Sequence, residues 1–153
     1  MTKTRFSLLL ISLLLIFDTK AQHKDSLAVL KAAGNFVADF NNFNWEGFRG
    51  SFTEDASIFY PFWTQAKRIS GKQDIEKTWL TIFPEFADTA NTRKLQINPK
   101  DLQIQLYGKT AIVTFHLGDG VNSLSRRTLV MIKQKRKWKI AHLHASSINE
   151  TKN

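Results

Sequence analysis

The sequence predicts a single α+β domain in which helices pack on one face of an antiparallel sheet. Large apolar residues recur at helical spacing in the first half of the chain, and they alternate with polar residues from Leu95 onward. Helices that precede the strands, rather than alternate with them, favour an antiparallel meander. The 153 residues are 42% hydrophobic, enough for one ordinary core. The absence of cysteine excludes disulfides, thiolate metal sites and thiol catalysis.

The first 21 residues are predicted to be a signal peptide. Lys3 and Arg5 form a basic start, residues 6–17 form an apolar run, and Ala21 is a small residue suited to cleavage. The run is shorter than the roughly 20 residues of a membrane span. We therefore expect an exported protein, periplasmic or secreted, with no stable membrane insertion once the signal is removed. An uncleaved membrane anchor is the alternative.

Cleavage after Ala21 leaves one domain, residues 22–153, which is still basic at +7, with 19 basic against 12 acidic side chains. The densest basic run surrounds a predicted hairpin tip and comprises Lys133, Lys135, Arg136, Lys137 and Lys139. Such a patch can bind nucleic acid. In an exported protein we interpret it as a solvated turn and expect no nucleic-acid partner.

The first helix is predicted between Asp25 and Phe43, with Asp25 or Ser26 as its cap. Its main apolar stripe steps by three or four residues, and Leu27, Leu30 and Val37 widen it. We expect this Phe-rich stripe, which includes Phe36 and Phe40, to form core and also one wall of a cavity.

Two more helices follow. Asn44 is placed to cap a short helix over residues 45–51. Ser70 and Gln73 form a capping-box pattern at the start of the third helix. Its apolar face includes Trp79 and Phe83, and Pro84 should kink or end it.

The strands are predicted from alternation and from the turns between them. Residues 52–55 are expected to be a turn, followed by a strand at 56–60 that Pro61 stops. The remaining segments are one strand or two over 95–106, bent at Asn98-Pro99, and strands over 110–117, 124–134 and 137–146.

The last strand carries the most concentrated chemistry. Strict alternation places Trp138, Ile140, His142, His144 and Ser146 on one face. We expect this face to run from the core into a pocket, so that His142 or His144 acts as a general acid or base, or contacts a ligand. The alternative is a structural role for both. Two histidines on one face, with His116 as a third, also suit a metal ion, but no acidic cluster completes such a site and we expect none.

Four other side chains are candidates for the pocket. Tyr60 is a plausible hydroxyl donor, and Trp63 contributes to an aromatic rim. Alternation requires one of Arg126 and Arg127 to face inward, where it would clamp a carboxylate or phosphate. The alternative is a charge at the rim, paired with Glu54 or Asp55.

Four segments together resemble the SnoaL-like branch of the nuclear transport factor 2-like superfamily. They are the helix end Phe36-Val37-Ala38-Asp39-Phe40-Asn41, the passage from Trp45 to Ala56, the helix start Gly71-Lys72-Gln73-Asp74-Ile75, and the closing strand Trp138 to Ser146. The resemblance implies a curved antiparallel sheet that helices close into a cone, with a pocket at the wide end. It also implies association through the sheet in many members.

The superfamily includes ketosteroid isomerase, polyketide cyclases, dehydratases, a kinase association domain and non-catalytic binders, so the fold does not decide the function. Isomerase chemistry needs a carboxylate base and an oxyanion hole, often formed by a tyrosine and a protonated acid. The first predicted helix of this chain has phenylalanines, Phe36, Phe40 and Phe43, where an isomerase would have that tyrosine.

We therefore expect an exported, homodimeric protein that binds a small, largely apolar ligand without a cofactor. One alternative is a cofactor-free isomerase, cyclase or dehydratase that uses His142, His144 and Tyr60. The other is a non-catalytic assembly module. The expected ligand-binding residues are Phe36, Phe40, Tyr60, Trp63, Trp79, Phe83, His116, Arg126, Arg127, His142 and His144.

Overall fold

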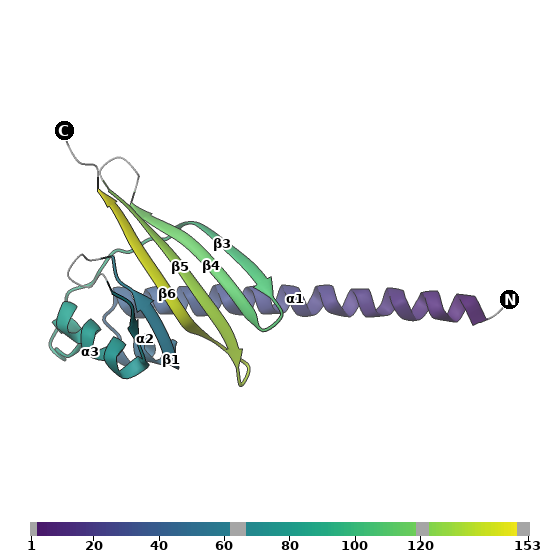
Figure 1. Cartoon of the computed structure of the whole chain (residues 1–153), viewed down its shortest axis with the longest axis horizontal. Helices are drawn as coiled ribbons and strands as arrows, with labels where there is room; N and C mark the ends of the chain where they lie inside the picture. The colour runs from purple at the N-terminus through teal and green to yellow at the C-terminus, as the bar shows by residue number, and fades with distance from the viewer. Residues whose placement is uncertain (1–2, 62–66, 119–122, 150–153) are drawn as a thin grey trace.

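The computed structural model describes residues 3–61, 67–118 and 123–149, and the side chains of residues 22–61, 67–118 and 124–148. Its helical elements are α1 (Lys3–Asn41), α2 (Trp45–Gly50), α3 (Lys72–Ile82) and the short 3-10 helix η2 (Pro84–Phe86). The strands are β1 (Phe52–Phe59), β2 (Ile69–Ser70), β3 (Lys100–Tyr107), β4 (Thr110–Gly118), β5 (Ser123–Gln134) and β6 (Lys137–Asn149). They form one sheet in the order β2-β1-β6-β5-β4-β3 (Figure 1).

The helices cover one face of this sheet, here called the inner face, and the opposite face is called the outer face. The predicted α+β class is therefore confirmed. The sheet is mixed, however, because β1 runs parallel to β6, with Phe52 beside Ile140 and Phe59 beside His144. Every other neighbouring pair is antiparallel. Residues 60–136 separate β1 from β6, so no hairpin forces these two strands to run in opposite directions.

Helix α1 is longer than predicted, because it continues without a break from Lys3 through the predicted signal peptide into the domain. Its first half extends past the edge of the sheet (Figure 1). Within the domain, Val29, Ala33 and Phe36 are buried, whereas Leu27 and Leu30 are exposed and do not widen the buried stripe as predicted. In the part of the chain that the structure describes, no helix is long and apolar enough to cross a membrane.

Two predicted element boundaries are wrong for local reasons. Residues 52–55 belong to β1 rather than to a turn, because Phe52 pairs with β6 and is buried beside Thr53. The capping box at Ser70 and Gln73 does not form, because Ser70 belongs to β2 and pairs with Ser57 of β1. Gly71 caps α3 instead, with a φ of 91° that glycine adopts without strain.

Other boundaries agree with the sequence. Asn44 caps α2, its side chain accepting a hydrogen bond from the Gly47 amide, and α3 ends before Pro84. Of residues 95–106 only the part from Lys100 onward is strand. The preceding segment is held against α1, because the Asn41 side chain donates to the Ile97 carbonyl and accepts from the Ile97 amide, at 2.9 and 2.8 Å.

The core beneath the sheet is an aromatic cluster centred on Phe48 of α2, which is 1% exposed. The Phe48 ring lies 4.8 to 5.5 Å, between ring centroids, from five other aromatic rings, which belong to Phe36, Phe40, Phe52, Trp79 and Phe86. Offset and edge-to-face pairs of this kind stabilise a core beyond the apolar area that they bury. The cluster joins α1, α2, α3 and β1 into one unit.

Candidate functional site

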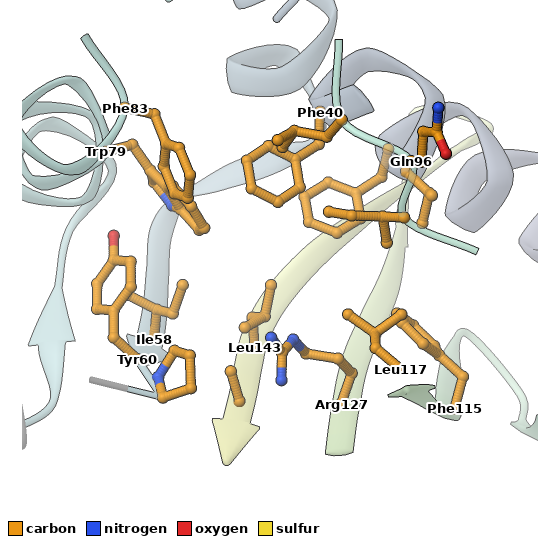
Figure 2. Close-up of a pocket in the computed structure, with 16 residues that line it drawn as sticks. Phe40, Ile58, Tyr60, Trp79, Phe83, Gln96, Phe115, Leu117, Arg127 and Leu143 are labelled. Carbon is orange, nitrogen blue, oxygen red and sulfur yellow. The ribbon is translucent and has the colours of Figure 1, made fainter. Parts of the chain in front are cut away.

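A cavity of about 350 Å³ lies between the aromatic cluster and the inner face of the sheet. Helices α1 and α3 form one side, and β4, β5 and β6 form the other (Figure 2). Residues 95–97, tied to α1 through Asn41, cover part of it. Its volume is in the range of small-molecule sites, and its lining is mostly apolar.

The aromatic side of the cavity consists of predicted residues. Phe36 and Phe40 of α1, Trp79 of α3 and Phe83, which directly follows α3, all line it. The ring of Phe40 lies 5.1 Å from both Trp79 and Phe83, measured between centroids. Helical spacing put these side chains on the same helix faces, and packing of α1 against α3 turned both faces toward the cavity.

Arg127 is the inward-facing member of the arginine pair, and it lines the cavity. In the sheet it lies between Phe115 of β4 and Ala145 of β6, both of which also line the cavity. Its Nη1 donates to the Ser125 hydroxyl and to the Arg126 carbonyl, the latter at 2.9 Å. Burial lowers the pKa of the guanidinium to about 10, so it remains a cation at neutral pH.

Tyr60 lines the cavity with its ring rather than with its hydroxyl. The hydroxyl donates to the Ile75 carbonyl at 3.4 Å, and Figure 2 shows it pointing toward α3. Burial raises the pKa of the phenol well above its usual value. A phenol this hard to ionise is poorly suited to act as an acid or base at neutral pH.

The prediction that His142 and His144 share a face with Trp138 and Ile140 is wrong. A β-bulge lies between these pairs: Met131 is opposite Ile140 and Val130 is opposite His142, so Ala141 has no partner in β5. The extra residue shifts the alternation by one, and Leu143 and Ala145 face the cavity instead.

His142 and His144 therefore lie on the outer face, and neither lines the cavity. His116 and Arg126 are also on the outer face, beside each other in the register of β4 and β5. Trp63, the remaining predicted residue, lies outside the described residues. Whether any outer-face residue binds a ligand stays a prediction.

His142 is held in place on the outer face. Its Nδ1 lies 2.8 Å from the Ser57 hydroxyl, and the Phe59 ring contacts both His142 and His144. The pKa of His142 is lowered, first by partial burial and then by the positive charges of His144 and Arg68. Among the described residues no three His, Asp or Glu side chains gather as a metal site would require.

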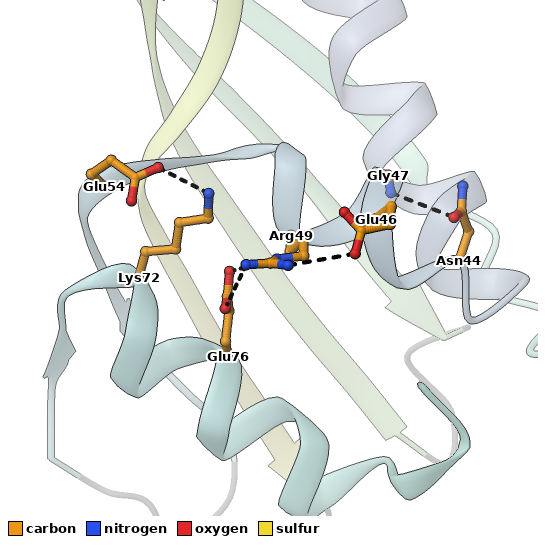
Figure 3. Close-up of polar contacts among 7 residues, drawn as sticks. All are labelled: Asn44, Glu46, Gly47, Arg49, Glu54, Lys72 and Glu76. Atoms are coloured by element: carbon orange, nitrogen blue, oxygen red, sulfur yellow. Dashed lines mark hydrogen bonds and ion pairs between the residues drawn. The ribbon is translucent and has the colours of Figure 1, made fainter. Parts of the chain in front are cut away.

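Glu54, one of the two acidic residues proposed as an alternative partner for an arginine, is engaged elsewhere (Figure 3). Glu54 accepts from Lys72 Nζ at 2.9 Å. In the same region Arg49 of α2 binds Glu76 of α3 through two nitrogens, Nε and Nη2, at 3.0 and 3.2 Å. These ion pairs link α2 and β1 to α3, and among the described residues neither Glu54 nor Asp55 forms an ion pair with Arg127.

Sequence reasoning missed several cavity residues. Leu143 and Ala145 were assigned to the wrong face because of the bulge. Phe115 and Leu117 lie two residues apart in the predicted strand over 110–117 and share a face, but nothing in the sequence indicates that this face lines a cavity. The segment 95–97 was predicted as strand. Its role as a cover depends on the contact with Asn41, 56 positions away from Ile97, and no local pattern signals it.

Comparison with known proteins supports the same fold. A dehydratase of the NTF2-like family proposed from Streptomyces avermitilis superposes with a TM-score of 0.68 at 22% identity, over 83% of this chain and 98% of that one. A proposed scytalone dehydratase from Novosphingobium aromaticivorans gives 0.66 at 12% identity, over 88% and 93%. The CaMKII hub of S. rosetta gives 0.61 at 22% identity, over 79% and 95%.

At these identities the similarity shows the fold alone. None of the curated proteins matches the sequence. Residues 29–150, which include every described strand and all of the described lining of the cavity, match the family described as SnoaL-like domain. The chain therefore belongs to the SnoaL-like domain family, with an NTF2-like fold.

Proposed function

We propose that the mature chain is an exported protein that binds a small, largely apolar ligand in the inner-face cavity. The observation that carries the proposal is the cavity itself: about 350 Å³, walled by aromatic and aliphatic side chains from α1, α3 and the sheet. Apolar surface left open inside a domain is costly, and a ligand that removes it from water is bound favourably.

Binding fits the lining better than acid–base catalysis does. Among the described residues, no Asp, Glu or His lines the cavity. Tyr60 uses its hydroxyl on the Ile75 carbonyl, and Arg127 is protonated at neutral pH. A dehydratase or isomerase moves protons, which requires a group that gains and loses one near the working pH. The two neighbours described as dehydratases share the fold, which does not by itself support this chemistry.

A neutral, fluorescent apolar probe, N-phenyl-1-naphthylamine, tests the proposal in the mature protein. Ala145→Leu adds three carbons to the cavity floor and should weaken binding at least tenfold. His144→Leu, one residue away on the outer face, should change the affinity less than twofold. If only His144→Leu lost binding, the binding site would lie on the outer face instead. If the wild-type protein did not bind the probe, the proposal would be refuted.

A further inference from the structure

Arg127 is the one charged side chain that lines the cavity among the described residues. Its neighbours in the sheet row are Phe115 and Ala145, and Figure 2 shows the guanidinium beside Leu143 in the cavity floor. A cation in such surroundings destabilises the fold unless an anion accompanies it. Its position therefore needs an explanation beyond packing.

No protein anion accompanies Arg127 in the described part of the chain. No carboxylate there lies within ion-pair distance of it. Both of its hydrogen bonds leave from Nη1, to Ser125 and to the carbonyl of Arg126. These bonds fix the orientation of the guanidinium and leave Nε and Nη2 without an acceptor among the described residues. Those two nitrogens share one edge, and that edge matches the two oxygens of a carboxylate.

The other polar groups of the lining add no negative charge. The Tyr60 hydroxyl is engaged with Ile75. The Trp79 indole nitrogen is a donor and has no hydrogen-bond partner among the described residues. Gln96 is uncharged, and Figure 2 shows its amide turned away from the cavity centre. Among the described residues, the cavity thus presents one cation and no anion to a ligand, on an otherwise mostly apolar surface.

We propose that the ligand is a monocarboxylate with an apolar body, its carboxylate accepting from Nε and Nη2 of Arg127 and its body packed on Phe40, Trp79 and Phe83. This inference rests on the proposed function and specifies its ligand class. A single cation balances a single carboxylate, whereas a phosphate dianion would need further donors. Both an aliphatic and an aromatic acid have this chemistry.

Two matched probe pairs test the inference by isothermal titration of the mature protein at pH 7. They are decanoate with 1-decanol, and 2-naphthoate with 2-naphthalenemethanol; within each pair the apolar body is the same or nearly so. Wild-type protein should bind at least one acid tenfold or more tightly than its alcohol, the expected size of a charge-assisted contact. The pair with the larger preference distinguishes an aliphatic from an aromatic ligand.

Three variants connect the preference to Arg127. Arg127→Met should lose the preference for the acid over its alcohol, while its melting temperature stays equal to that of the wild type or rises. Arg127→Lys should keep part of this preference. Arg126→Met is the matched control, because it removes the same charge one residue away on the outer face, and it should keep all of it.

Equal binding of acid and alcohol by the wild type would overturn the inference and leave the proposed function standing. So would a preference that survives in Arg127→Met. Failure of all four probes to bind would overturn both. The wild-type comparison decides the matter by itself if Arg127→Met does not fold.

Discussion

Arg126 and Arg127 are neighbours in β5 with the same side chain and opposite surroundings. Arg126 is exposed on the outer face, whereas Arg127 lines the cavity and has its pKa lowered by burial. The sequence alone predicted that one of the two faces inward. Which one it is depends on the register of β5 against β4 and β6, and no local pattern fixes that register.

The burial of Arg127 should be visible in the stability of the protein. Arg127→Met removes an unpaired cation from apolar surroundings at the loss of two hydrogen bonds, so the free energy of unfolding at pH 7 should rise by about 1 kcal/mol. Urea unfolding measures it. The gain should shrink as the pH rises through about 10, where the wild-type guanidinium loses its proton in the folded state.

Arg126→Met should leave the free energy of unfolding nearly unchanged, since exposed charges contribute little. A loss of stability in Arg127→Met comparable to that of a core truncation would instead show that Arg127 holds the fold together.

A second single-residue test concerns His142 and the pH dependence of stability. Its pKa should lie below the ordinary value of 6.5 in an NMR titration, because the charged ring is partly buried and faces His144 and Arg68. As the pH falls below 6.5 the unfolded chain binds this proton first. The free energy of unfolding should therefore fall until the pH reaches the folded pKa of His142.

His144→Leu removes one of the two positive charges and should shift the His142 midpoint upward, with burial still holding it below 6.5. A midpoint at or above 6.5 in the wild type would contradict this account of the outer face.

At the scale of elements, α2 shows how tertiary contacts stabilise a helix that is too short to be stable alone. Its six residues are capped by Asn44, anchored by Phe48 in the aromatic cluster and bound by Arg49 to Glu76 of α3. Most of its stability therefore comes from burial of Phe48 rather than from the helix itself.

Phe48→Ala should accordingly lower the free energy of unfolding by about 3–4 kcal/mol, the usual cost of a cavity left by a phenylalanine. Glu46→Ala, on the exposed side of the same helix, should cost less than about 0.5 kcal/mol. Denaturant titration of the two variants checks both values. Equal effects would mean that surface charge, rather than the aromatic core, holds α2.

The elements also show where sequence periodicity is reliable. It predicted the main buried stripe of α1 and the apolar face of α3, because each keeps one phase along the part of the chain that packs. It failed on β6, where the buried residues are Trp138 and Ile140, then Leu143 and Ala145. The step from 140 to 143 breaks a period of two, and a bulge leaves no other sign in the sequence.

At the scale of the whole molecule, the fold class and the aromatic wall were predictable, and the chemistry of the opposite wall was not. Segments at 95–97 and 143–145 meet α1 and α3 only through contacts between distant parts of the chain. Such contacts depend on the register of the strands and on the packing of the helices against the sheet. Neither can be predicted from local sequence patterns.

The continuous helix α1 bears on export. Cleavage after Ala21 would leave the buried residues Val29, Ala33 and Phe36 in the mature helix and remove a stretch that Figure 1 shows beyond the sheet. N-terminal sequencing of secreted or periplasmic protein should therefore begin at Gln22.

Light scattering should give twice the mass of the mature chain if the predicted homodimer forms. An intact Met1 would refute the signal peptide, and a monomeric mass the dimer.

Ala141 does not line the cavity, but it is the extra residue of the strand that does. Because β6 has one residue more than β5 over the same stretch, β6 bends at this β-bulge. Removing that residue from the chain would restore a plain alternation with Ile140 and Leu143 still on one face. The bend of β6 and the side chains that β6 presents to the cavity are thus encoded by different residues.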